Sequence, residues 1–257
     1  MNKIDFSKYV DYIFCVNYLP NNRLKTISEQ ISYLGININD SRLFSFEFGI
    51  ENKLFEENIE KYVKEFDIKF VDSFKYQRYM FEVGLNIYHI LKIAQYKKYK
   101  RIIIFEDDIK VLKDLDYIEQ ALNYICNIDA DYVHCDPNYS RMYRGIESYL
   151  LNNNLIEPVD NPYFYKLIYS YWGMCVYDSG FMILSERSIN RLIELFEKNQ
   201  ITCGLDMIYN VLFLENIMDL NIYSAIKPLA IQEKTLKYPK EILEGINVHM
   251  NIDEYNI

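Results

Sequence analysis

The sequence lacks the features that mark membrane and secreted proteins. No segment approaches the run of about 20 apolar residues that a membrane helix needs. The first twelve residues are polar and charged, without the apolar centre of a signal peptide. We therefore expect a soluble cytoplasmic protein that could act at the inner face of the cell membrane.

Cysteines and basic residues are also sparse. The 5 cysteines are scattered without a C-x-x-C pair, which suggests neither a zinc site nor a disulfide framework. Lys and Arg number 28 against 37 Asp and Glu, giving a net charge of −9 that argues against a large nucleic-acid footprint. The negative charge of a bound nucleotide would then have to be neutralised locally, by a metal ion or a single arginine. The oligomeric state is not indicated.

The most informative stretch is an apolar run that ends in three adjacent carboxylates. Residues 101–105 read as a strand buried on both faces of a parallel sheet, and Glu106, Asp107 and Asp108 follow directly. Ligands of open α/β sheets lie beyond the carboxyl ends of the strands. The sequence therefore predicts concentrated negative charge at a binding crevice.

Two interpretations of these carboxylates stay open. In the first, they spread into solvent at an acidic turn, where one Asp caps the next helix. In the second, a cation holds them together, as in an oxygen-rich Mg²⁺ or Mn²⁺ site that carries a nucleotide diphosphate.

The remaining pattern alternates strands and helices, which predicts an α/β domain. Arg23 falls in a first helical turn, where it is either a surface residue or a contact to a nucleotide phosphate. Residues 137–172 lack clean periodicity and are expected to be a substrate loop or insertion. The expected strands are 12–17, 43–48, 131–135 and 181–184. One helix is expected to end near residue 34, and four more are expected at 79–96, 114–126, 186–198 and 207–214. No domain boundary is evident within 1–257.

The helix expected at 79–96 carries one narrow polar stripe. Glu82, Asn86 and His89 lie at spacings that place them on one side of a helix whose other side is apolar. The simpler interpretation is a solvated edge.

Several motifs follow one another at characteristic spacing. They are Val16, Asn17 and Tyr18 with Arg23; Phe81, Glu82, Val83 and Gly84 with Tyr88 and His89; Glu106, Asp107 and Asp108; residues 180–185; and Asp206 at a helix start. Together, over most of residues 12–232, they resemble glycosyltransferase family 25, which includes bacterial lipopolysaccharide and lipooligosaccharide sugar transferases. Phe81, Tyr88 and Leu85 depart from the family pattern, which affects the substrate preference more than the fold.

The resemblance implies a GT-A fold, a Rossmann-like, mostly parallel sheet flanked by helices that binds a nucleotide sugar. It also implies a hexosyltransferase that moves galactose or another hexose from a UDP-linked donor to a lipopolysaccharide or surface polysaccharide. Asn17, Arg23, Glu82, His89, Glu106 and Asp107 would contact the donor, and Asp108 with Glu106 would bind Mn²⁺ or Mg²⁺. His249 is a candidate further metal ligand, although a lone His near a chain end is more often exposed.

Inversion, which the resemblance also implies, requires a carboxylate that takes the proton of the acceptor hydroxyl. Asp206 is the first candidate and Asp178 the second, although the helix dipole alone favours an Asp in a first turn.

Two rival functions remain. Asp108 and Lys110 have the D-x-K form of some metal nucleases, but the acidic net charge argues against this. A non-catalytic nucleotide-sugar or glycan-binding module with a degenerate transferase fold is the alternative from another class.

Overall fold

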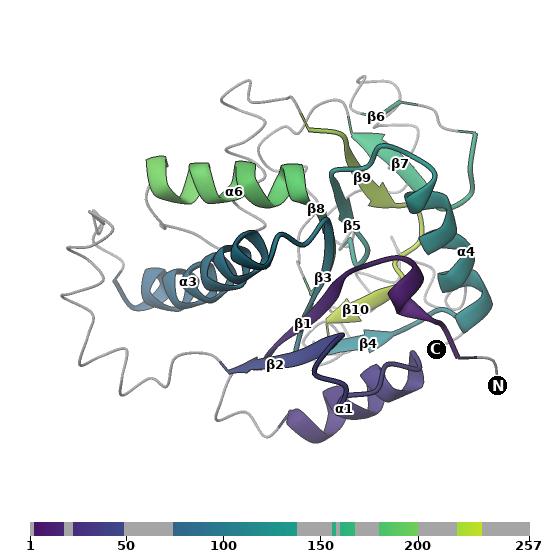
Figure 1. Ribbon diagram of the computed structural model, residues 1–257, viewed down its shortest axis with the longest axis horizontal. Helices are drawn as coiled ribbons and strands as arrows, with labels where there is room; N and C mark the ends of the chain where they lie inside the picture. The colour runs from purple at the N-terminus through teal and green to yellow at the C-terminus, as the bar shows by residue number, and fades with distance from the viewer. Residues whose placement is uncertain are drawn as a thin grey trace, which may run out of the picture.

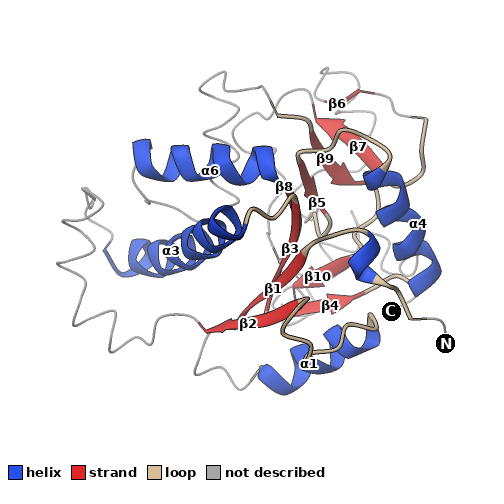
Figure 2. Ribbon diagram, in the orientation of Figure 1, coloured by secondary structure: helices blue, strands red, loops and turns tan. Residues whose placement is uncertain are grey.

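The computed structural model describes residues 3–17, 23–48, 74–137, 156–157, 160–167, 180–199 and 220–232. Helices lie on both sides of a central sheet (Figure 2). The helices are η1 (Phe6–Lys8), α1 (Leu24–Tyr33), α3 (Phe74–Lys97), α4 (Leu115–Cys126) and α6 (Glu186–Asn199). The strands are β1 (Tyr12–Asn17), β2 (Phe44–Phe48), β3 (Arg101–Glu106), β4 (Ile109–Val111), β5 (Tyr132–His134), β6 (Ile156–Glu157), β7 (Phe164–Leu167), β8 (Phe181–Ser185), β9 (Ile222–Ala225) and β10 (Ala230–Gln232).

The central sheet has eight strands in the order β2-β1-β3-β8-β5-β9-β7-β6. Strands β1, β2, β3, β5, β9 and β6 run in one direction, while β8 and β7 are reversed. The expected α/β architecture, a mostly parallel sheet with flanking helices, is therefore confirmed. The buried strand β3 pairs in parallel with β1 on one side and antiparallel with β8 on the other.

Alternate residues of the central strands face two separate cores, as the period of a strand requires. Phe14 and Ile104 contribute to the core beneath α3 and α6, whereas Ile13 and Ile103 contribute to the core beneath α1 and α4. Figure 1 shows these two pairs of helices on opposite sides of the sheet. Because both faces are covered, ligands have access to the sheet at the ends of its strands.

A second, two-stranded sheet lies directly after the acidic motif. Strand β4 starts at Ile109 and pairs antiparallel with β10, with Gln232 opposite Ile109. The last residue of β10 is thereby placed next to the end of β3. The expectation of a loop at 137–172 also needs refinement, since β6 and β7 lie within it and β7 joins the main sheet beside β9.

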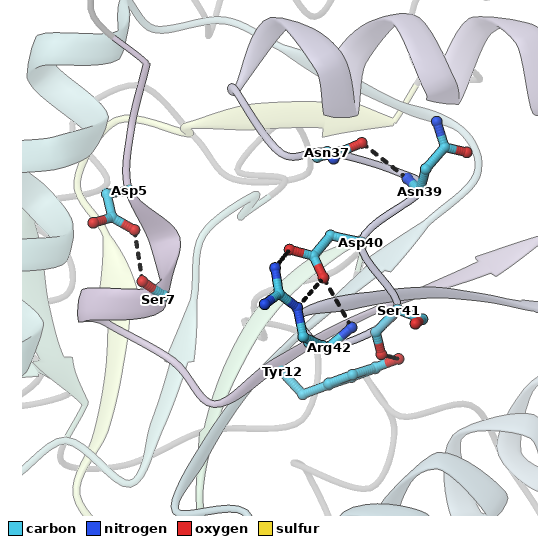
Figure 3. Close-up of polar contacts among 8 residues, drawn as sticks. All are labelled: Asp5, Ser7, Tyr12, Asn37, Asn39, Asp40, Ser41 and Arg42. Carbon is cyan, nitrogen blue, oxygen red and sulfur yellow. Dashed lines mark hydrogen bonds and ion pairs between the residues drawn. The ribbon is translucent and has the colours of Figure 1, made fainter.

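The opposite, amino-terminal end of the sheet is closed by local turns. Helix α1 ends at Tyr33, and Gly35, just beyond its C-cap, has a φ of 92° that glycine adopts readily. In the turn before β2, both carboxylate oxygens of Asp40 accept hydrogen bonds from the Arg42 guanidinium, at 2.9 Å each (Figure 3). The Tyr12 hydroxyl donates to the carbonyl of Ser41 at 3.3 Å, which ties this turn to β1.

Among the helices that the structure describes, none combines the length and the apolar character that a membrane crossing requires.

Candidate functional site

The acidic motif occupies the carboxyl end of β3. Glu106 is the last residue of the strand, and Asp107 and Asp108 form the turn to β4. Asp107 is 2% exposed and Asp108 7% exposed, so the interpretation as a solvated acidic turn is wrong for these two residues. They do not cap the next helix either, because Asp114 caps α4 by accepting a hydrogen bond from the backbone N–H of Tyr117.

A cation holds the two aspartates together, and in this structure it is Arg23. Its Nη1 lies 3.1 Å from Asp107 Oδ1 and 3.2 Å from Asp108 Oδ2. The side chain of Arg23 is 27% exposed, so it is not a freely solvated surface residue. A cation at the start of α1 opposes the helix dipole, and the two carboxylates offset that cost. Contact between Arg23 and a nucleotide phosphate stays a prediction.

Strand register explains how residues 84 positions apart in the chain meet. Strand β1 pairs in parallel with β3, with Val16 opposite Glu106. The carboxyl ends of both strands therefore lie at the same edge of the sheet, where Arg23 meets the acidic motif. Asn17, the last residue of β1, has its backbone at this edge, while its side chain lies outside the described residues.

A second set of buried polar groups adjoins Glu106. The Glu106 backbone N–H donates to the Gly180 carbonyl at 2.9 Å, and the Gly180 N–H donates to Asp136 Oδ2 at 2.8 Å. The Gln232 amide donates through Nε2 to Glu106 Oε2 at 2.9 Å. His134 Nε2 lies 3.5 Å from Asp136 Oδ1. The ends of β3, β5 and β10 and the start of β8 thus converge here.

Sequence reasoning missed Asp136 and Gln232. Asp136 could have been found, since it follows the strand expected at 131–135 as the acidic motif follows β3. Gln232 carried no comparable signal, because a three-residue strand is too short to show periodicity.

The polar stripe on α3 is divided between two environments. Asn86 is buried, at 8% exposure, whereas His89 lies on the exposed side of the helix. The side chain of Glu82 lies outside the described residues. A solvated edge therefore describes His89 but not Asn86, and the donor contacts of Glu82 and His89 stay predictions.

Asp178, Asp206 and His249 lie outside the described residues, so the structure does not place them. Within the described residues, no group of three or more His, Cys, Asp or Glu side chains is arranged to hold a metal ion. The carboxylate oxygens of Glu106 and Asp108 are nevertheless the hard donors that Mg²⁺ and Mn²⁺ prefer. A metal ion at Asp108 would share that carboxylate, or compete for it, with Arg23.

Two cysteines near the site, Cys15 and Cys135, are buried. Burial, with Asp107 and Glu106 close by, raises the pKa of the Cys15 thiol well above its usual value. Burial and the neighbouring Asp136 do the same to the pKa of Cys135. Because the thiolate is the reactive form, burial and a raised pKa both lower the reactivity of these thiols.

No protein-family model and no curated protein matches the sequence. Among solved structures, the chain is similar to mannose-1-phosphate geranyltransferase from Thermus thermophilus, at 9% identity over 83% of this chain and 73% of that chain, with a TM-score of 0.42. It is also similar to a glycosyltransferase involved in glycosylation of the major capsid of PBCV-1, at 10% identity, 92% and 99% coverage and a TM-score of 0.40. Mouse xyloside xylosyltransferase 1 in its apo form gives 11% identity, 81% and 82% coverage and a TM-score of 0.35. Likeness at this level assigns no family, substrate or reaction to this chain.

Proposed function

We propose that this chain is a glycosyltransferase that moves a sugar from a nucleotide diphosphate donor to a glycan acceptor. The observation that carries the proposal is the pair of buried carboxylates, Asp107 and Asp108, bridged by Arg23 at the carboxyl edge of the sheet. Burying charged groups is costly, and a protein that needed only a turn here would expose them. The location is where α/β sheets bind ligands. The ordered motifs that resemble glycosyltransferase family 25 support the same function and a GT-A fold.

In this proposal each charged group has a role in holding the donor. Arg23 is close enough to the motif to contact the diphosphate, because its guanidinium already lies at the edge where the phosphates would bind. Asp108, with Glu106, would hold Mn²⁺ or Mg²⁺, and that ion would supply Lewis-acid stabilisation of the departing phosphate. Glu106 would contact the ribose or base, and Asp107 would keep Arg23 in place.

The acceptor hydroxyl must lose its proton as it attacks the anomeric carbon. We assign this role to Asp206, with Asp178 as the second choice. Replacing Asp206 with Asn should abolish turnover and leave donor binding intact, because the amide cannot take a proton. Loss of donor binding in Asp206→Asn would contradict the assignment.

The finer features follow the resemblance. The donor would be a UDP-linked hexose such as galactose, the acceptor a lipopolysaccharide or surface polysaccharide, and the reaction inverting. Such an enzyme would act in the cytoplasm or at the inner face of the cell membrane. Asn17, Glu82 and His89 would complete the donor contacts, and His249 the metal shell.

Thermal unfolding with UDP, GDP, ADP or CMP, each with and without Mn²⁺, tests the proposal. A ligand at 100 times its dissociation constant adds about 2.7 kcal/mol to the unfolding free energy. We expect a Mn²⁺-dependent rise in unfolding temperature with UDP that is lost in Asp108→Ala. Asp40→Ala is the matched control, because Asp40 also pairs with an arginine but lies at the other end of the sheet. The Asp40→Ala variant should keep the Mn²⁺-dependent rise in unfolding temperature with UDP.

Labelled UDP-sugars then separate an enzyme from a binding module. An enzyme hydrolyses its donor slowly without an acceptor, and this hydrolysis should disappear in Asp108→Ala. A nucleotide-dependent rise without donor hydrolysis would favour the non-catalytic module. No rise with any nucleotide would contradict the glycosyltransferase and leave a glycan-binding module as the alternative.

A further inference from the structure

The side-chain amide of Gln232 is buried, and only one of its two polar atoms has a hydrogen-bond partner in the described part of the chain. Gln232 is 2% exposed, and its Nε2 donates to Glu106 Oε2 at 2.9 Å. Its Oε1 is buried and accepts no hydrogen bond from any residue in the described part of the chain. A buried acceptor without a donor costs free energy. What the arrangement provides is a fixed position for the Glu106 carboxylate.

The surroundings leave Gln232 little freedom to move. A Cβ on Gly180 would lie 3.3 Å from Gln232 Cγ, 2.7 Å from Ile109 Cγ2 and 2.8 Å from Asp136 Oδ2, so these groups pack closely around the glycine. The Gly180 peptide joins Asp136 on one side to the Glu106 backbone on the other. Glu106 is therefore held twice, through its backbone by Gly180 and through its side chain by Gln232.

We propose that Gln232 is a positioning residue of the nucleotide site, which fixes the Glu106 carboxylate in the orientation that receives the nucleoside of the donor. The inference rests on the proposed function, because Glu106 is assigned there to the ribose or base. Gln232 acts through Glu106, and strand β10 places the Gln232 amide next to the end of β3. A buried polar group kept at a cost to stability is typical of a site that must be preorganised.

Gln232→Leu separates positioning from a structural role, because the two predict different results. Leucine has nearly the size of glutamine and removes both the unmatched acceptor and the Nε2 donor. We expect the unfolding temperature to change little, because removal of the buried unmatched acceptor offsets the loss of the hydrogen bond to Glu106. The Kd for UDP in the presence of Mn²⁺, measured by calorimetric titration, should increase about tenfold, the scale seen when a residue that orients a ligand-binding group is lost. An unchanged Kd would overturn the proposal.

Gln95→Leu is the matched control. Gln95 also donates through its Nε2, at 2.8 Å to Asn190 Oδ1, but it joins α3 to α6 away from the acidic motif. This variant should leave the Kd for UDP unchanged.

The Glu106→Ala background provides the second test. If Gln232 acts through Glu106, adding Gln232→Leu to Glu106→Ala should cause no further loss of UDP affinity, even if Gln232→Leu is itself less stable. A further loss of about tenfold in this background would overturn the proposal. Failure of the proposed function is recognised separately, because the wild-type chain would then bind none of UDP, GDP, ADP and CMP before any variant is made, and the inference would fall with it.

Discussion

Aspartates pair with an arginine near each end of β1, and the two arrangements differ in exposure and in sequence separation. At the amino-terminal end, Asp40 and Arg42 are two residues apart, and Arg42 is 89% exposed (Figure 3). At the carboxyl end, Arg23 bridges Asp107 and Asp108 across 84 residues of sequence, and Asp107 is nearly inaccessible. In the first pair Arg42 lies in water and Asp40 is 26% exposed, whereas in the second both aspartates are almost fully withdrawn from water and Arg23 is 27% exposed.

The difference indicates which pair has a role beyond the fold. An exposed pair gains little from its charges because water and salt screen them. A buried pair loses hydration that its mutual attraction only partly repays, so it is weak evidence of a stabilising device. We therefore look for function at the carboxyl end of the sheet, and the predictions below test that contrast.

The largest effect is expected from the glycines at the two ends of the sheet. In Gly180→Ala the new Cβ would meet Ile109 at 2.7 Å and Asp136 at 2.8 Å, so the surrounding groups must shift. In Gly35→Ala it would meet Lys3 Cβ at 2.8 Å and also require a positive φ. Each should lower the unfolding free energy by about 1–3 kcal/mol, measured by urea denaturation.

Only Gly180→Ala should also weaken UDP binding, because only Gly180 contacts the residues that hold Glu106. If Gly35→Ala weakened UDP binding to the same extent, the contrast between the two ends of the sheet would be wrong.

The second prediction removes one arginine at a time. Arg23→Gln leaves two buried carboxylates without their guanidinium and should lower the unfolding free energy by roughly 1–3 kcal/mol, less than for a fully buried pair because Arg23 is partly exposed. Arg42→Gln should leave the unfolding free energy unchanged within error. Urea denaturation at low and high salt measures both. Equal effects of the two substitutions would refute the distinction between the pairs.

The sequence allowed most of the central elements to be predicted. The apolar runs at 101–105 and 12–17 correspond to β3 and β1, because strands buried in a sheet are strongly apolar. The reversed direction of β8 could not be predicted, since a central strand is equally apolar whether its neighbours run parallel or antiparallel. Strand direction depends on how the chain returns to the sheet, which local pattern does not encode.

The candidate site was predicted only in part. The carboxylates at the end of β3 were recognised because three adjacent acids after an apolar run are conspicuous. Their partner Arg23 was considered as a surface residue or a phosphate contact, and its pairing with Asp107 follows from the register between β1 and β3. Contacts such as that between Gln232 and Glu106 join positions 126 residues apart, which no local pattern reveals.

The third prediction concerns the thiols. Cys15 and Cys135 are buried and their pKa values are raised, so little thiolate forms at about pH 8. Cys126 is exposed. With N-ethylmaleimide, Cys126 should be modified first, and Cys15 and Cys135 only when the chain unfolds. Mass spectrometry of the labelled peptides measures the three rates, and rapid labelling of Cys15 in the folded protein would show that the end of β1 is open to water.

The smallest effect concerns Asp40. Hydrogen bonds from the Arg42 side chain and backbone lower the pKa of Asp40. A carboxylate whose pKa is lower in the folded state than in the unfolded state contributes stability above its unfolded pKa, and this contribution is lost as the pH falls through the folded pKa. In Arg42→Gln the pKa of Asp40 should therefore rise towards its ordinary value, and the acid end of the stability curve should flatten slightly.

A pH titration of the Asp40 carboxyl carbon by NMR measures this pKa directly. Asp5 serves as the internal control, because the Ser7 hydroxyl is the main cause of its lowered pKa and Arg42 is not among the causes. If the pKa of Asp40 stayed low in Arg42→Gln, the turn backbone rather than the guanidinium would hold it down. The exposed pair would then contribute even less than its geometry suggests, and the contrast with Arg23 at the far end of β1 would be sharper still.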